Sequence, residues 1–459
     1  DSSVGAGTIL APFGGKYQMS PTDVSIMKFP VLDKNTDTAS AITWGFNPYI
    51  SEWSTYHGAI YAVVESLAKL VAAGVDYKTA RLSFQEYFEK LGKDSYKWSK
   101  PFLALLGAMK AQKDFDVAAI GGKDSMSGTF NDISVPPTLI SFAVSPVNVH
   151  DVISTEFKKA KNKLYLVENK IDEKDFLFNS EELKENFEFV LKNIKDKKIV
   201  SAMVIKMGGL AEALSKMSFG NRLGFEINNK DVDLFSLKPA SILIETTEEL
   251  SYKNAIYLGE VSDKFEGKVN GENINLENVE SVWLNKLKPI FPYKLEKEVE
   301  TYDIKNKISE KKIYKSSITV AKPRVVIAAF PGTNSEYDMY NRFNENGAEA
   351  KITLLRNLTQ NHLAESVDQM CKDLRNSQIF VLPGGFSAGD EPDGSGKFMA
   401  AVLQNPKLMD EIKAFLGRDG LILGVCNGFQ ALVKSGLLPY GEIGNVHENS
   451  PTLTFNKIG

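Results

Sequence analysis

The last third of the chain alternates strand and helix patterns in a way that few folds allow. Short apolar runs recur between helical patterns, and three of them lead into turns that contain glycine; the runs are PRVVIAAF, ITLL, QIFVLPGG and LILGVCNG. Alternation of this kind predicts a parallel sheet with its functional loops at the carboxyl ends of the strands. We therefore expect a parallel-sheet α/β domain over residues 323–459.

The rest of the chain adds two further units and a linker. A chain of 459 residues exceeds what one hydrophobic core supports, so two to four domains are expected. Residues 1–150 combine glycine- and proline-containing loops, an apolar helical segment at 60–73 and the β-rich stretch SVPPTLISFAVSPV, which indicates one α/β unit. Residues 151–291 alternate strand-like and helical patterns and form a second unit, and the lysine-rich segment 292–322 has the composition of a solvated linker. The first residues resemble the middle of a domain, so we expect a fragment of a longer protein.

Composition excludes several classes of protein. The 54 basic and 58 acidic residues nearly balance, at a net charge of -4, and no basic run is interleaved with aromatics, so no nucleic-acid partner is expected. Neither a signal peptide nor an apolar run of membrane-spanning length is present in these residues. The two cysteines are far apart in the sequence and suggest neither a disulfide framework nor a zinc site, which favours the reducing cytoplasm.

One of these cysteines lies at a strand-to-helix turn. Cys426 follows an apolar strand at 421–425, stands between Gly424 and Gly428, and precedes a helical pattern. Small flanking residues permit a sharp turn, and a helix N-terminus lowers the pKa of a thiol and offers N–H groups to an oxyanion. A buried, inert cysteine is the alternative. The upstream Gly384-Gly385 pair, which allows backbone amides to approach the same carbonyl, favours a nucleophile.

Three motifs in this region resemble those of the class I glutamine amidotransferases, and within them the glutaminase domain of the phosphoribosylformylglycinamidine synthase family. They are FPGTNSEYDM at 330–339, LPGGFSAGD at 382–390 and GVCNGFQ at 424–430. The resemblance implies a flavodoxin-like fold for this domain. It also implies that Cys426 attacks the glutamine amide to form a glutamyl thioester.

The resemblance assigns further roles around that thiol. Backbone N–H groups of Asn427 and Gly385, beside Gly384, would form the oxyanion hole, and Gln430 would lie near the bound glutamine. A His and a Glu further downstream complete the triad in the family, and this chain ends before that segment, so we expect little or no glutaminase turnover from it. His447 follows the cysteine by 21 positions, and an exposed loop histidine is the favoured interpretation over a catalytic base.

A second candidate site lies in AIGGKDSMSGTF at 119–130. Gly121 and Gly122 let the backbone approach phosphate oxygens, Lys123 supplies positive charge, and Asp124 offers a hard oxygen for Mg²⁺. Ser125 completes the predicted phosphate-binding set. An ordinary turn between strands is the alternative for such residues.

Residues 1–290 resemble the aminoimidazole-ribonucleotide-synthetase-like half that precedes the glutaminase in the single-chain form of the same family. The resemblance implies an ATP or ADP site with Mg²⁺ held by Asp23, Glu65 and Asp124. Relatives often carry Asn where this chain has Lys69, which leaves the number of metals open. The alternatives for Glu65 are a solvated helix position and an i,i+4 pair with Lys69. His57 is expected to cap or pack a helix start rather than to contact the nucleotide.

The resemblance therefore implies an ATP- and glutamine-dependent conversion of formylglycinamide ribonucleotide to formylglycinamidine ribonucleotide in purine biosynthesis. The expected partner is a missing N-terminal half of the same enzyme, and the nucleotide site adjoining the glutaminase is expected to be auxiliary rather than catalytic. Two alternatives are a cysteine hydrolase on the same sheet and a non-catalytic, nucleotide-binding assembly module.

Overall fold

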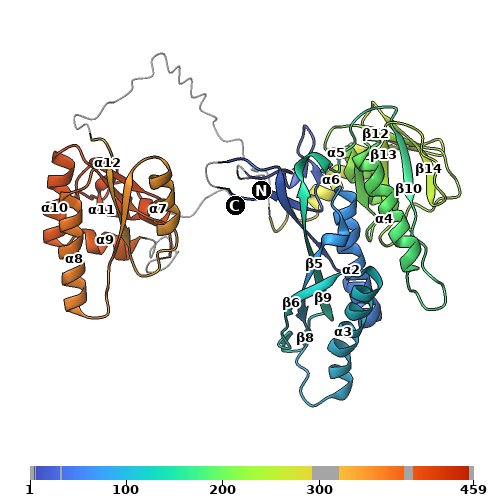
Figure 1. Cartoon of the computed structure of the whole chain (residues 1–459), viewed down its shortest axis with the longest axis horizontal. Helices are drawn as coiled ribbons and strands as arrows, with labels where there is room; N and C mark the ends of the chain where they lie inside the picture. Colours follow the sequence, from blue (N-terminus) through green and yellow to red (C-terminus); the bar gives the residue numbers. More distant parts are fainter. Residues whose placement is uncertain (1–4, 6, 32–33, 292–319, 387–395, 454–459) are drawn as a thin grey trace. The chain divides into compact units, whose positions relative to one another are not determined.

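The computed structural model describes residues 5, 7–31, 34–291, 320–386 and 396–453. The chain divides into two compact units, Asp1–Ile290 and Phe291–Gly459 (Figure 1). The predicted linker at 292–322 lies almost entirely outside the described residues. None of the described helices is long and apolar enough to cross a membrane.

The first unit begins with a five-stranded sheet of order β3-β4-β9-β5-β6, in which only the β5 and β6 pair is parallel. Its strands are β3 (Ser25–Lys28), β4 (Thr38–Gly45), β5 (Arg81–Tyr87), β6 (Ala118–Lys123) and β9 (Thr138–Asn148). Two long helices accompany it, α2 (Thr55–Ala72) and α3 (Ser95–Phe115). The Ser54 side chain caps α2 by accepting the His57 N–H, and most of α2 is buried, as its apolar sequence predicts.

Short elements surround this sheet. They are β1 (Phe13–Gly14), β2 (Ser20–Pro21), α1 (Pro48–Trp53), η1 (Tyr77–Thr79), β7 (Thr129–Phe130), β8 (Ile133–Ser134) and η2 (Val149–Asp151). The predicted boundary between residues 150 and 151 falls in η2, between the last strand of this sheet and the first strand of the next.

The second sheet of this unit has seven strands in the order β11-β13-β10-β14-β12-β15-β16. They are β10 (Lys163–Val167), β11 (Ile199–Val204), β12 (Gly224–Ile227), β13 (Ile242–Thr246), β14 (Ala255–Ser262), β15 (Glu266–Val269) and β16 (Glu272–Asn275), with helices α4 (Ser180–Lys195), α5 (Gly209–Phe219) and α6 (Leu276–Asn285). Only β12 and β15 pair in parallel. Asn270 and Gly271, both at positive φ, form the two-residue turn that joins β15 to β16 as a hairpin. This part of the first unit is therefore an α+β fold with a mostly antiparallel sheet.

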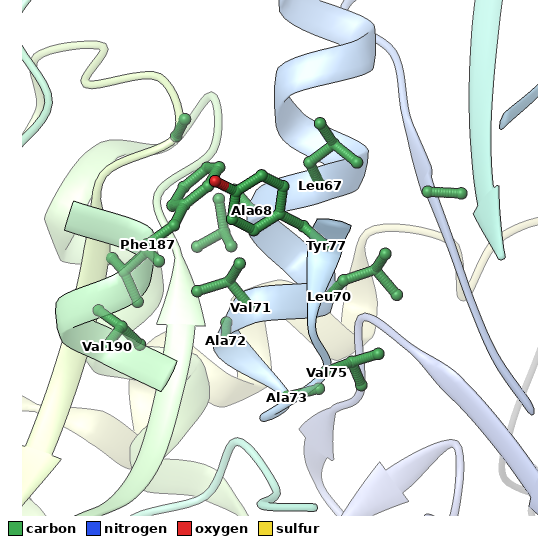
Figure 2. Packing of buried hydrophobic residues seen from close by; sticks show 14 of the residues in the cluster. Leu67, Ala68, Leu70, Val71, Ala72, Ala73, Val75, Tyr77, Phe187 and Val190 are labelled. Atoms are coloured by element: carbon green, nitrogen blue, oxygen red, sulfur yellow. The ribbon is translucent and has the colours of Figure 1, made fainter. Parts of the chain in front are cut away.

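Helix α2 contributes to a core shared by both sheets. Leu67 and Val71 of α2 lie opposite Phe187 and Val190 of α4, and all four side chains are buried (Figure 2). The rings of Tyr77 and Phe187 meet edge to face, with centroids 5.4 Å apart. This core fixes α2, and with it Glu65 and Lys69, against the second sheet.

The second unit contains the predicted parallel sheet, of order β18-β17-β19-β20 with every neighbouring pair parallel. The strands are β17 (Arg324–Ala329), β18 (Glu349–Leu354), β19 (Ile379–Leu382) and β20 (Leu421–Gly424). The helices are α7 (Glu336–Glu345), α8 (Gln360–Arg375), α9 (Lys397–Leu403), α10 (Pro406–Gly417), α11 (Asn427–Ser435) and α12 (Leu437–Tyr440). The expectation of a flavodoxin-like parallel sheet is confirmed for this unit.

Candidate active site and nucleotide pocket

Cys426 occupies a sharp turn between β20 and α11. Its backbone has φ 49° and ψ -110°, a conformation that residues other than glycine rarely adopt, and its side chain is exposed. Because Cys426 is the N-cap residue of α11, its thiol lies at the end of the helix where backbone N–H groups are unsatisfied by the helix itself. The turn has the geometry of a nucleophile elbow.

The glycines on either side of the cysteine are required by packing. A Cβ on Gly428 would lie 1.9 Å from the carbonyl oxygen of Leu382, at the end of β19. A Cβ on Gly424 would lie 2.6 Å from the Leu432 side chain. Only glycine lets the first turn of α11 approach the sheet this closely, and that approach places Cys426 above the ends of the strands.

The loop after β19 meets this turn. A Cβ on Gly384 would lie 3.3 Å from the Cβ of Cys426, so the two backbones are neighbours. Gly385 has φ 149°, and a Cβ there would lie 2.4 Å from the Gly332 carbonyl oxygen. The Gly384 N–H donates to Ser335 Oγ at 3.0 Å, and Ser335 Oγ donates to the Gly384 carbonyl at 3.3 Å.

The three motifs near 330, 384 and 426 therefore meet at one edge of the sheet. Sequence reasoning did not single out Ser335, although it lies inside the first motif. Its side chain fixes the orientation of the Gly384 peptide. The position of the motif directly after β17 is the sequence signal for this role. Residues 387–395, which include part of the second motif, lie outside the described residues.

Asn427 and Gln430 lie directly behind the cysteine in α11. The buried Asn427 side chain donates to Gln430 Oε1 at 3.1 Å, and the Gln430 N–H donates to the Cys426 carbonyl at 3.0 Å. His447 is exposed, its ring contacts Tyr440 with centroids 5.5 Å apart, and no contact joins it to Cys426 among the residues described. These positions agree with the favoured interpretation of His447 as a loop histidine.

The predicted magnesium ligands are not brought together. Asp23 accepts both of its hydrogen bonds from Lys206 Nζ, at 2.8 and 3.0 Å, and Glu65 pairs with Lys69 Nζ at 2.6 Å. Asp124 lines a different pocket. Across the described ranges, no group of three His, Cys, Asp or Glu side chains could hold a metal ion. Asp23 and Glu65 thus have ammonium groups where a cation would bind.

Glu65 lines a pocket of 370 Å³ between the two sheets of the first unit. The pocket is walled mainly by apolar groups, including Trp44, Tyr61 and Leu237, and Lys206 and Glu212 also line it. His57 lies at the start of α2, where Nδ1 bonds to Ser54 Oγ and Nε2 to the Asp175 carbonyl, both at 2.8 Å. Both ring nitrogens are engaged, which supports the packing role expected for His57.

The predicted phosphate-binding residues form one wall of a second pocket, of 680 Å³. Gly121, Gly122 and Lys123 line it together with Asp124, and they belong to β6 rather than to a loop after a strand. The glycine-rich run remains in the sheet because β6 is an edge strand and Gly121, at φ 149°, takes up a register shift against β5. Ser125 bonds instead to Ser127 Oγ at 2.8 Å.

Glu86 is a feature of this pocket that sequence reasoning missed. It is 5% exposed, its Oε1 atom has no hydrogen-bond partner among the described residues, and it faces the phosphate-binding run. Burial, and then the charge of Asp124, raises the pKa of Glu86 to about 7. The alternation of polar and apolar residues along β5 did not indicate that a carboxyl group lies on the buried face of this strand.

We expect Glu86→Gln to change the pH dependence of stability in the first unit. Because the folded pKa of Glu86 is raised from 4.5 to about 7, the wild-type protein loses stability as pH rises through this window. The Gln variant lacks this loss and should gain about 1–2 kcal/mol over wild type between pH 5 and pH 8, after allowance for screening through the open pocket. Urea unfolding of both proteins at the two pH values measures the difference.

Glu89→Gln is the matched control for that experiment. Lys100 and Lys97 bond to Glu89 and lower its pKa below 4.5, so its removal should reduce stability about equally at pH 5 and pH 8 and leave the pH profile between them as in wild type. Equal pH profiles for wild type and Glu86→Gln would show that Glu86 titrates normally.

Comparison with known proteins finds relatives of the second unit. Residues 322–459 match the CobB/CobQ-like glutamine amidotransferase domain family. A phosphoribosylformylglycinamidine synthase subunit PurQ from Treponema denticola is 36% identical over 146 residues, which cover 30% of this chain and 50% of that protein. The PurQ subunit of Methanococcus maripaludis strain C5 is 36% identical over 125 residues, covering 26% and 42%.

The second unit is thus similar to the PurQ subunit of phosphoribosylformylglycinamidine synthase. The chain spans about half the length of the curated relatives it matches. Among solved structures, Thermotoga maritima PurL complexed with ATP aligns with 56% of this chain and 39% of its own, at 18% identity and a TM-score of 0.41. Aquifex aeolicus thiamine monophosphate kinase aligns with 53% and 93%, at 15% identity and a TM-score of 0.36.

Proposed function

We propose that Cys426 is the nucleophile of a glutaminase that supplies ammonia for the synthesis of formylglycinamidine ribonucleotide. The observation that supports this most directly is the position of an exposed thiol at a helix N-terminus, beside the Gly384 backbone. A thiolate in this position attacks the side-chain amide carbon of glutamine. The C–N bond then breaks, and the nitrogen takes up a proton and leaves as ammonia. Water then hydrolyses the glutamyl thioester to glutamate and restores the thiol.

The N–H groups at this turn are suited to an oxyanion. The Asn427 and Gly385 amides are the proposed donors, and Ser335 supports them by fixing the neighbouring Gly384 peptide. Gln430, held by Asn427, is proposed to lie beside the bound glutamine. In the complete reaction, ATP phosphorylates the amide oxygen of formylglycinamide ribonucleotide, ammonia attacks that carbon, and phosphate leaves.

For the first unit we propose nucleotide binding. Gly121, Gly122 and Lys123 offer backbone and positive charge to the phosphates of ATP or ADP, with Ser125 at the end of the run. Mg²⁺ is the cofactor predicted with the nucleotide. The ion pairs of Asp23 and Glu65 with lysines argue against these two carboxylates as its ligands. An assembly role, in which the nucleotide only stabilises the fold, is the second candidate for this unit.

A surface of the first unit supports the proposal of a partner half. On α3, Trp98, Phe102 and Leu105 are each more than half exposed, and Ile120 on edge strand β6 is 78% exposed. The four side chains border one pocket. An apolar surface beside an edge strand is suited to a second polypeptide segment, here the predicted N-terminal half of the enzyme. We place the protein in the cytoplasm, in keeping with its two free cysteines.

The test of the glutaminase proposal is labelling with a glutamine analogue. We expect 6-diazo-5-oxo-L-norleucine to modify Cys426 and not the buried Cys371, whose thiol pKa is raised by burial. Saturating glutamine should slow the modification about tenfold by occupying the same site. Intact-mass measurement and peptide mapping give the site and the rate.

Two variants and one reagent serve as controls. Cys426→Ser should remove the label, whereas Cys371→Ser should keep it. Iodoacetamide reports general thiol reactivity at Cys426. If it reacts as selectively as the analogue and glutamine gives no protection, the site is that of a general cysteine hydrolase and the glutaminase proposal fails.

A further inference from the structure

Asp23 and Glu65 each form an ion pair with a lysine of the first unit. Lys206 Nζ contacts both carboxylate oxygens of Asp23, and Lys69 Nζ lies 2.6 Å from Glu65 Oε1. These oxygens are the atoms that a hard divalent cation would use. Their ammonium partners belong to the protein itself.

Lys69 is almost completely buried. Its side chain is 1% exposed, Nζ donates to the Trp44 carbonyl at 2.8 Å, and it lies 4.1 Å from the centroid of the Trp44 ring. A buried ammonium requires a counter-ion, and Glu65 provides it. A divalent cation on Glu65 would remove that counter-ion and place a second positive charge beside Lys69.

Lys206 ties together distant parts of the first unit. It follows β11, while Asp23 lies between β2 and β3, 183 positions earlier in the chain. Its Nζ donates to both carboxylate oxygens of Asp23, at 2.8 and 3.0 Å, and its side chain is 21% exposed. The contact therefore joins β11 to the segment before β3 through a charge-assisted hydrogen bond.

Glu212, which lines the 370 Å³ pocket with Glu65 and Lys206, is also paired. Glu212 pairs with Lys216 and accepts the Gly208 N–H at 2.8 Å. Asp23, Glu65 and Glu212 thus each have a lysine partner, and three negative charges meet three positive ones. The local charge that would attract a dication is already balanced.

We infer that Lys69 and Lys206 take the place of a divalent cation at Asp23 and Glu65, so that these two carboxylates are held by internal ion pairs and do not bind Mg²⁺. The inference rests on the proposed nucleotide function only for the expectation that a metal belongs here. The proposed nucleotide site is the separate pocket lined by Gly121, Gly122 and Lys123, so nucleotide binding there does not depend on these carboxylates. Removal of the two ammonium groups should uncover the two carboxylates as a metal site.

The test uses Mn²⁺ as the probe, with free ion measured by electron paramagnetic resonance, on the whole chain. Wild type should bind Mn²⁺ no tighter than about 1 mM, the weak end of carboxylate sites. The double variant Lys69→Gln/Lys206→Gln should bind at least about tenfold tighter, because Gln removes charge while keeping a donor for the Trp44 carbonyl. Lys163→Gln, which unpairs exposed Glu260 elsewhere in the first unit, should bind as wild type does.

Two results would overturn the inference. One is Mn²⁺ binding to wild type below about 1 mM that Asp23→Asn or Glu65→Gln weakens, since those carboxylates would then hold a metal despite their lysines. The other is a double variant with wild-type circular dichroism and no gain in Mn²⁺ binding. If the double variant does not fold, Lys206→Gln alone, at a side chain 21% exposed, decides by the same gain or its absence. A parallel melt with ADP in EDTA tests the nucleotide proposal separately, since it needs no metal.

Discussion

Gly428→Ala should lower the free energy of unfolding of the second unit by about 3 kcal/mol or more. The added methyl group would lie 1.9 Å from the carbonyl oxygen of Leu382, and a backbone atom of β19 cannot move aside as a flexible side chain can. Helix α11 must then shift away from the sheet, taking Cys426 with it. Calorimetry of the second unit's transition measures the loss, and labelling by the glutamine analogue should fall in parallel.

The matched control is Gly417→Ala. Gly417 ends α10, and no atom lies within 4 Å of where its Cβ would be. Alanine there should be neutral or stabilise by up to about 1 kcal/mol, since it only reduces the freedom of the unfolded chain. If Gly428→Ala melts and labels like this control, then α11 does not depend on close contact with β19.

Glu245→Ala should destabilise the first unit by about 3–5 kcal/mol. Glu245 is fully buried in β13 and accepts hydrogen bonds from four groups: the N–H groups of Lys158 and Lys159, Asn162 Nδ2 and Ser201 Oγ. Its removal leaves these donors in the interior without an acceptor and opens a cavity where the carboxylate was. Urea unfolding followed by the first unit's tryptophan fluorescence gives the change in the free energy of unfolding.

Glu260→Ala tests whether any lost glutamate has this effect. Glu260 lies on β14, which is separated from β13 by β10 in the same sheet, pairs with Lys163 and has a side chain 41% exposed. Its loss should cost no more than about 1 kcal/mol, as is usual for a surface ion pair. A similar cost for both variants would mean that the buried network around Glu245 contributes nothing beyond a surface charge.

The cysteine site was accessible to sequence reasoning because its requirements are local. A strand, a glycine on each side of Cys426 and a helical pattern are all visible within about ten residues, and each follows from how a sharp turn must be built. The contact between this turn and Gly384 joins two strand ends of one parallel sheet, which strand and helix alternation also predicts. Ser335 was missed because a serine at a helix start usually caps its own helix.

The pairing of the predicted magnesium ligands was harder to predict from the sequence, because it depends on charged partners that are far away in the chain. Asp23 and Glu65 were expected to share an ion with Asp124, but nothing in the sequence shows that Lys206 folds back onto Asp23 or that Asp124 lines another pocket. For Lys69, the i,i+4 spacing did indicate the pair with Glu65 that the structure contains.

By itself, the sequence determined the parallel sheet of the second unit, the turn that presents Cys426 and the apolar helix α2, because periodicity and turn chemistry act over a few residues. Only the tertiary structure decided which buried carboxyl groups have partners. Among the described residues, Glu245 has four donors, Asp23 and Glu65 have lysines, and Glu86 Oε1 has no hydrogen-bond partner. The free energy of a buried charge is set by groups that the fold brings near from distant segments, and no local pattern records them.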